Sequence, residues 1–88
     1  MAYTVQFSSA ALKKLEKMDA KVHVRLVNWV EKNLEGCTNP RCFGKALTQN
    51  LKEYWSYRVG KYRLMAKIKD AEVLIYIVRV DKREDVYN

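Results

Sequence analysis

The alternation of apolar and polar side chains between residues 51 and 87 constrains the fold of this chain more than any other feature. In a β-strand, a period of two places successive side chains on opposite faces of the sheet. The alternating sets of the first strand are Trp55, Tyr57 and Val59 and, on the other face, Tyr54, Ser56 and Arg58. Gly60 then favours a tight turn, because it adopts a positive φ without a steric clash.

Two more strands are predicted in the same segment. Strand 62–69 has an apolar face and a mostly basic face. The apolar set is Tyr62, Leu64, Ala66 and Ile68, and the other set is Arg63, Met65 and Lys67. A turn at Asp70 and Ala71 leads into the mostly apolar strand 72–80, in which Arg79 is the exception. One face of this meander can form a core, while the other carries a row of cations.

The amino-terminal half is predicted to form a short strand and two helices. These elements are a strand at 3–7, a helix at about 10–18 and a helix at about 20–35. Ser8 or Ser9 can cap the first helix and Asp19 the second, while Gly36 can end the second helix. Helices joined so closely form an antiparallel hairpin. Residues 36–50 are expected to be a long connection.

The predicted order of elements is therefore β-α-α-β-β-β, which is an α+β fold. The 88 residues suffice for one domain, 1–88, with one small core. We expect the helical hairpin to pack on one face of a mainly antiparallel, four-stranded sheet. The other face would then be open to solvent, which antiparallel sheets tolerate.

The formal net charge of +7 is concentrated in the strand-rich half. Residues 1–40 carry six Lys or Arg and four Asp or Glu, a balance of +2. Residues 41–88 carry eleven and six, a balance of +5. Such an excess can attract a polyanion, either nucleic acid or an acidic protein. A basic surface that serves only solubility is the alternative.

The sequence predicts neither a membrane segment nor a metal centre. No apolar run approaches the roughly 20 residues of a membrane span, and the start lacks the features of a signal peptide, so we expect a cytoplasmic protein. Cys37 and Cys42 are expected to be reduced thiols, with a local disulfide as the alternative. With His23 as the single histidine, they do not make a zinc site, and no cofactor is expected.

The residues exclude several kinds of enzyme and leave RNA cleavage open. The chain has no glycine-rich phosphate loop and no nucleophile with a histidine placed beside it, which disfavours NTPases and proteases. RNA carries its own nucleophile, the 2′-OH, so an enzyme need only orient it and neutralise the phosphate, a task that suits arginine. Neighbouring cations such as Arg83 would favour the phenolate of Tyr87 as a base. Alternatively, Tyr87 is a terminal aromatic packed on the sheet edge.

Three stretches of the chain together resemble the RelE/ParE toxin superfamily. They are Gly-Lys-Ala-Leu at 44–47, Trp-Ser-Tyr-Arg-Val-Gly-Lys-Tyr-Arg at 55–63 and Arg-Val-Asp-Lys-Arg-Glu-Asp-Val-Tyr at 79–87. The motif R-V-G-x-Y-R in the second stretch and the Lys-Arg…Val-Tyr tail in the third are the most specific parts. The resemblance implies a RelE-like, microbial-ribonuclease-like fold. It also implies a bacterial or archaeal toxin of a type II toxin–antitoxin module.

RelE-like members of this superfamily enter the ribosomal A site and cut mRNA there. The resemblance thus implies a metal-independent endoribonuclease, an mRNA interferase that inhibits translation. By position, Arg63 matches the arginine that stabilises the phosphate transition state, Arg83 the arginine near the leaving 5′-oxygen, and Tyr87 the general base. Arg58 matches a basic strand residue, whereas Ser56 occupies a position where RelE has a lysine.

The resemblance also implies further contacts and partners. The side chains expected to contact RNA or the ribosome are Lys45, Ser56, Lys61, Lys67 and Lys82. The implied partners are the ribosome, mRNA and a RelB-like antitoxin with an acidic, partly disordered segment. The toxin–antitoxin complex would reach operator DNA through the antitoxin. Two alternatives remain: a ParE-like gyrase inhibitor without nuclease activity, and an inactive member that serves as an antitoxin partner.

Overall fold

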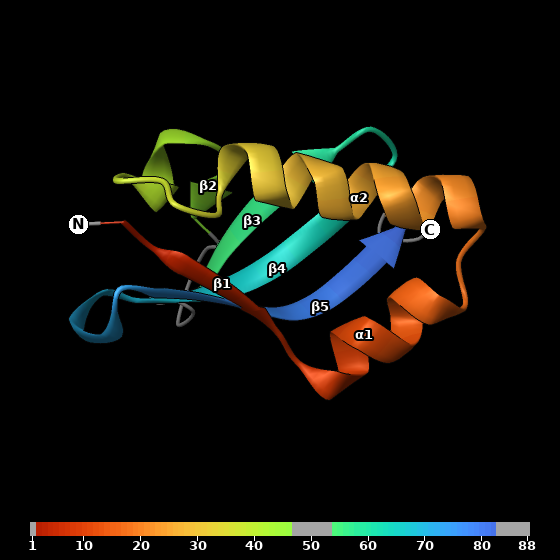
Figure 1. Ribbon diagram of the computed structural model, residues 1–88, viewed down its shortest axis with the longest axis horizontal. Helices are drawn as coiled ribbons and strands as arrows, with labels where there is room; N and C mark the ends of the chain where they lie inside the picture. Colours follow the sequence, from red (N-terminus) through yellow and green to blue (C-terminus); the bar gives the residue numbers. More distant parts are fainter. Residues whose placement is uncertain (1, 47–53, 83–88) are drawn as a thin grey trace.

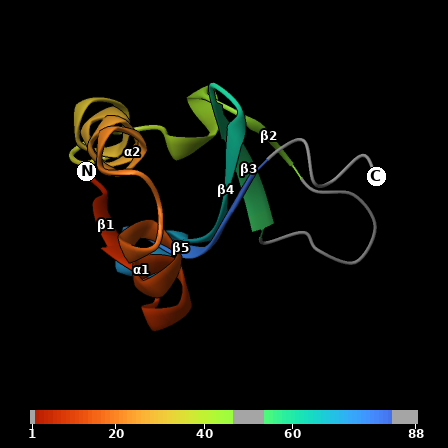
Figure 2. The ribbon, with the colours of Figure 1, turned by 90° about the vertical axis from the view of Figure 1, so that its right-hand side faces the viewer.

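The chain folds into a five-stranded sheet with two helices on one of its faces (Figures 1 and 2). The computed structural model describes residues 2–46 and 54–82. The strands are β1 Thr4–Phe7, β2 Lys45–Ala46, β3 Tyr54–Val59, β4 Tyr62–Lys69 and β5 Leu74–Lys82, and the helices are α1 Ser9–Glu16 and α2 Ala20–Asn33. The two helices run in roughly opposite directions, as the predicted hairpin requires (Figure 1). The predicted α+β class and helical layer are confirmed.

The sheet has the order β1-β5-β4-β3-β2 and is mainly antiparallel, as expected. Only the β1–β5 pair is parallel. The predicted count of four strands was wrong by one, because β2 forms within the segment expected to be a connection. A strand of two residues is too short to produce a periodic pattern. Gly44 brings it close to β3, since a Cβ there would collide with the backbone carbonyl of Ser56.

The core lies between the helices and the sheet face predicted to be apolar. From the helices it takes Ala11, Leu15, Leu26, Val30 and Leu34, and from the sheet Tyr57, Val59, Leu64, Ala66, Ile75, Ile77 and Val80. Trp29 and Trp55 pack against this cluster. The burial of Tyr57 and Val59 on one side of β3, with Arg58 exposed between them, confirms the predicted alternation.

A β-bulge in β5 decides which side chains of that strand face outward. The pairing shifts from Met65↔Arg79 to Ala66↔Ile77, so Val78 is an extra residue in β5. Without it, Arg79 would share the face of Ile77; with it, Arg79 turns away from the core. The Ser8 hydroxyl donates to the carbonyl of Val78 at 2.9 Å and supports the bulge.

The predicted helix caps are present, although both helices end two residues earlier than expected. The Ser8 Oγ accepts from the backbone N–H of Ala11 at 3.0 Å, and an Asp19 carboxylate oxygen accepts from that of Lys21 at 3.1 Å. His23 is half-buried, with its Nδ1 3.0 Å from the carbonyl oxygen of Leu15. This contact joins the two helices of the hairpin.

Two sets of contacts fix the connection between α2 and β2. The backbone N–H of Gly36 donates to the carbonyl of Tyr3, so the outer edge of β1 is paired. Further along, Arg41 donates through both terminal nitrogens to Asp70, at 2.9 and 3.0 Å, and the Tyr3 hydroxyl donates to the same carboxylate at 2.6 Å. Hydrogen bonding from Arg41 lowers the pKa of Asp70. This cluster ties the connection to the β4–β5 turn.

Candidate nucleic-acid interface

The sheet face turned away from the helices, here called the open face, is built from three cross-strand rows. In the first row, Arg58 of β3 lies opposite Arg63 of β4, which lies opposite Asp81 of β5. The turn at Gly60, with φ +60, fixes this register, because it joins β3 to β4 through a two-residue loop. The sequence therefore places two arginines directly side by side.

The remaining rows mix cations with other side chains. The second row is Lys45, Ser56, Met65 and Arg79, and the third row is Tyr54, Lys67 and Tyr76. Ser56 is only 5% exposed, although it was predicted to contact RNA. Of the two residues that β2 and β3 contribute to this row, Lys45 is exposed and Ser56 is buried.

Some arginines of the open face form an ion pair with an acidic side chain, and others do not. The Nε of Arg79 lies 3.0 Å from a carboxylate oxygen of Asp81, so the acidic residue of the first row forms an ion pair with Arg79. Within residues 2–46 and 54–82, Arg58 and Arg63 make no hydrogen bond or ion pair. Like charges directly opposite one another on a sheet are destabilising. Two opposed guanidinium groups without an acidic partner indicate a site for an external anion.

Sequence reasoning missed the aromatic members of this face. Tyr54 and Tyr76 flank Lys67 in the third row, and the Nζ of Lys69 lies 5.5 Å from the ring centroid of Tyr76. Aromatic rings interleaved with cations are typical of surfaces on which single-stranded RNA stacks. The parity of Tyr54, shared with Arg58, was a signal available in the sequence. For Tyr76 no such signal was available, because the bulge in β5 breaks the alternation along that strand.

The other residues predicted to be catalytic or to contact RNA do not all lie on the open face. Arg58, Arg63, Lys45 and Lys67 share the open face, and Lys61 lies in the adjoining turn. Lys82 pairs with Tyr62 and is on the helix side, where it lines a groove with Lys14 and Lys17. Lys82, which was predicted to contact RNA or the ribosome, therefore lies on the other side of the sheet from Arg63, because the bulge shifts the alternation of β5. Arg83 and Tyr87 lie outside the described residues.

Other kinds of site find little support in the described part of the chain. It holds no group of three or more His, Cys, Asp or Glu side chains that could bind a metal ion. Cys37 and Cys42 are free thiols, and burial raises the pKa of Cys37. None of its helices is long and apolar enough to cross a membrane.

Comparison with known proteins identifies relatives along nearly the whole chain. The family model of the ParE toxin of type II toxin–antitoxin systems matches residues 5–87. Toxin RelG of Mycobacterium tuberculosis is 34% identical over 87 residues, which cover 99% of this chain and 98% of RelG. A putative RelE-like toxin protein of Escherichia coli is 32% identical over 92 residues, which cover 100% of this chain and 93% of that protein.

Solved structures of related toxins have the same fold. In the toxin–antitoxin complex RelBE2 of M. tuberculosis, the matching chain has a TM-score of 0.84 and 32% identity, with coverage of 94% of this chain and 100% of that one. A double arginine-to-alanine mutant of E. coli RelE in the free state has a TM-score of 0.76 and 26% identity, with coverage of 99% and 92%. This chain therefore belongs to the RelE/ParE superfamily of toxins from type II toxin–antitoxin systems.

Proposed function

We propose that this toxin is an endoribonuclease that cleaves mRNA in the ribosomal A site and so inhibits translation. The observation that carries the proposal is the pair Arg58 and Arg63, opposed on the open face without an acidic partner among the described residues. Similarity to RelG and to RelE-like toxins supports it. The cell compartment implied by a translated substrate is the cytoplasm.

The proposed reaction uses the RNA itself as the source of the nucleophile. The 2′-oxygen attacks the neighbouring phosphorus, the bond to the 5′-oxygen breaks, and the products are a cyclic phosphate and a 5′-hydroxyl. Arg63 and Arg58 would neutralise the charge that accumulates on the phosphate oxygens. In this proposal Tyr87, as the phenolate, accepts the proton of the 2′-OH. Arg83 stabilises the leaving 5′-oxygen, which takes a proton from water to become the 5′-hydroxyl. No metal ion takes part.

Primer extension on mRNA from cells that express the toxin tests this function. Wild-type protein should generate new 5′ ends within translated codons, and Arg63→Ala should abolish them. Lys21→Ala, which removes an exposed cation of α2, serves as the matched control and should cleave like wild type. Absence of new 5′ ends with the wild-type protein would refute the proposal.

A second candidate function is inhibition of DNA gyrase without nuclease activity. It is favoured by one observation, the match of residues 5–87 to the ParE toxin family. A supercoiling assay with purified gyrase separates the two candidates. Inhibition of supercoiling by wild-type protein and equally by Arg63→Ala would support the ParE-like function.

We further propose that a RelB-like antitoxin binds this toxin. Related toxins have been solved in complex with antitoxins, including RelBE2 of M. tuberculosis and RelE–RelB of Pyrococcus horikoshii. The basic open face suits an acidic segment that orders on binding. The complex would bind operator DNA through the antitoxin.

A further inference from the structure

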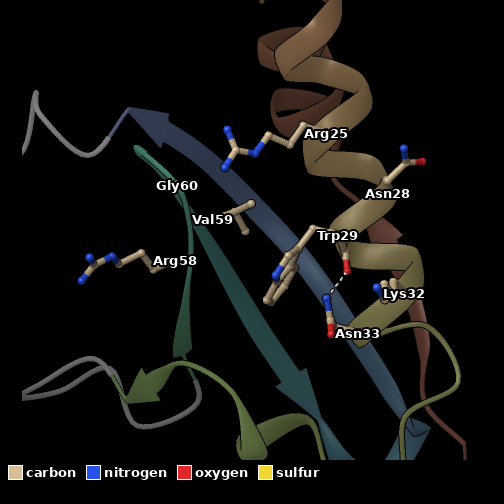
Figure 3. Close-up of a pocket in the computed structure, with 8 residues that line it drawn as sticks. All are labelled: Arg25, Asn28, Trp29, Lys32, Asn33, Arg58, Val59 and Gly60. Carbon is tan, nitrogen blue, oxygen red and sulfur yellow. Dashed lines mark hydrogen bonds between the residues drawn. The ribbon is translucent and has the colours of Figure 1, made fainter.

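We propose that a groove between α2 and the β3–β4 turn is a second RNA-backbone site, which holds a phosphate next to the strand bound on the open face. The α2 groove has a volume of about 440 Å³ (Figure 3). The polar residues of α2 that line it are Arg25, Asn28, Lys32 and Asn33, and β3 contributes Arg58, whose side chain points away from α2. The inference rests on the proposed nuclease function, because it takes RNA as the ligand.

The charge of the α2 groove is entirely positive among the described residues. Arg25 and Lys32 of α2 line it, the guanidinium of Arg58 lies on the far side of β3, and none of the described lining residues is Asp or Glu. Arg25, Lys32 and Arg58 also make no hydrogen bond or ion pair within residues 2–46 and 54–82. A concave site lined by cations alone concentrates a positive field. Its ligand is therefore an anion.

The guanidinium of Arg25 lies against the turn at Gly60. A Cβ at position 60 would lie 3.3 Å from a terminal guanidinium nitrogen of Arg25, so this side chain rests against a turn that has no side chain of its own. Figure 3 shows Arg25 extending from α2 toward Gly60. A Cβ at position 60 would require the guanidinium to move by a few tenths of an ångström, and the positive φ there would strain any residue other than glycine.

The α2 groove is continuous with the open face around a free edge of the sheet. Within residues 2–46 and 54–82, β2 pairs with Trp55 and Ser56 alone, so the part of β3 beyond Ser56 is an edge of the described sheet. Arg58 lies on this edge and points away from α2, whereas Arg25 reaches toward the same turn from the helix (Figure 3). An RNA strand that crosses the edge would meet Arg63, then Arg58 and then Arg25.

The lining favours a nucleic-acid backbone over an acidic polypeptide. Segments that fold onto a groove are anchored by apolar side chains. The large exposed apolar side chains, Leu12, Val24 and Phe43, do not line the α2 groove. The ring of Trp29 is already engaged, with centroids 6.0 Å from Phe43 and 5.9 Å from Tyr57. Trp29 and Val59 give the groove apolar surface as well, and the Asn33 amide nitrogen already donates to the carbonyl of Trp29. The other donors are guanidinium, ammonium and amide groups, which contact phosphates.

Binding of a single-stranded RNA that cannot be cleaved tests this site. The probe is a fluorescent 12-mer with 2′-O-methyl sugars, measured by anisotropy at several salt concentrations with full-length protein. The Arg25→Gln/Lys32→Gln variant should bind this RNA roughly 10-fold more weakly than wild type, because it loses hydrogen bonds from charged donors. Because the site holds one phosphate, and each lost phosphate contact removes about 0.7 from the salt slope, the slope should fall by about 0.7.

A matched variant separates this site from general charge effects. Lys13→Gln/Lys21→Gln removes the same charge from exposed helix positions outside the α2 groove. This control should bind the RNA within twofold of the wild-type affinity. Both double variants should unfold at the same temperature as the wild-type protein. Equal losses in the two double variants would overturn the proposal. So would weaker binding of poly-L-glutamate with unchanged RNA binding, which would indicate a site for an acidic polypeptide.

The same measurement distinguishes this inference from the proposed nuclease function. The probe reports binding without cleavage, whereas primer extension reports cleavage. A toxin that cleaves mRNA while its Arg25→Gln/Lys32→Gln variant binds the probe like wild type would refute only the second site. A wild-type protein that neither binds the probe nor cleaves mRNA would refute both.

Discussion

Removing either of the two opposed arginines should stabilise the fold while it destroys the function. Arg58 and Arg63 are cross-strand partners, and neither forms an ion pair with an acidic side chain among the described residues. Directly opposed like charges on a sheet cost about 0.5 kcal/mol, the middle of the observed range. For a domain of this size, that free energy corresponds to a rise of about 2–4 °C in the unfolding temperature.

A double-mutant cycle with Arg58→Gln and Arg63→Gln measures this repulsion. Each single substitution should raise stability, and the second should add nothing, so the pair shows an unfavourable coupling of about 0.5 kcal/mol. The cycle is needed because Arg63 also lies opposite Asp81, and the single substitution mixes both effects. Glutamine keeps most of the stem that packs on the half-buried strand.

A measurement in high salt and a control substitution at Arg79 test whether the coupling is electrostatic. In 1 M salt the Debye length falls to about 3 Å, so the coupling should vanish. Arg79→Gln removes an arginine that is paired with Asp81, and it should not stabilise the protein. Thermal unfolding followed by circular dichroism supplies all values. Destabilisation by both single substitutions, or a gain that persists in high salt, would refute the electrostatic reasoning.

Three further predictions concern the contacts that support the sheet. Tyr57→Phe removes a buried hydroxyl that donates to a backbone carbonyl, and it should lower the free energy of unfolding by about 1–2 kcal/mol, whereas Tyr76→Phe should not. Because the pKa of Asp70 is lowered in the folded state, its contribution is present above pH 3.8 and lost as the pH falls further. Urea midpoints should therefore drop less between pH 5 and pH 2 for Asp70→Asn than for wild type. Gly44→Ala should destabilise the protein more than Gly36→Ala, measured by urea unfolding, because only the former adds a backbone collision to the strain of a positive φ.

The sequence determined the elements whose pattern is local. The period of two in β3 and β4 placed Tyr57 inside and Arg58 outside, because neighbouring peptide units in a strand point in opposite directions. The helix caps were also predictable, because Ser8 and Asp19 accept hydrogen bonds from backbone amides within three residues of themselves. Gly60 determined the tight turn between β3 and β4, and that turn places Arg58 opposite Arg63.

The tertiary structure decided the features that depend on distant residues. Strand β2 is too short for any periodic pattern and exists because Gly44 approaches Ser56 closely, which also helps to bury that serine. The bulge at Val78 turned Arg79 outward and left Lys82 on the helix side. The α2 groove joins Arg25 to Arg58, which are 33 positions apart in the sequence. Alternation and capping depend on neighbouring peptide units, whereas the bulge, the edge and the groove depend on packing between segments far apart in the chain.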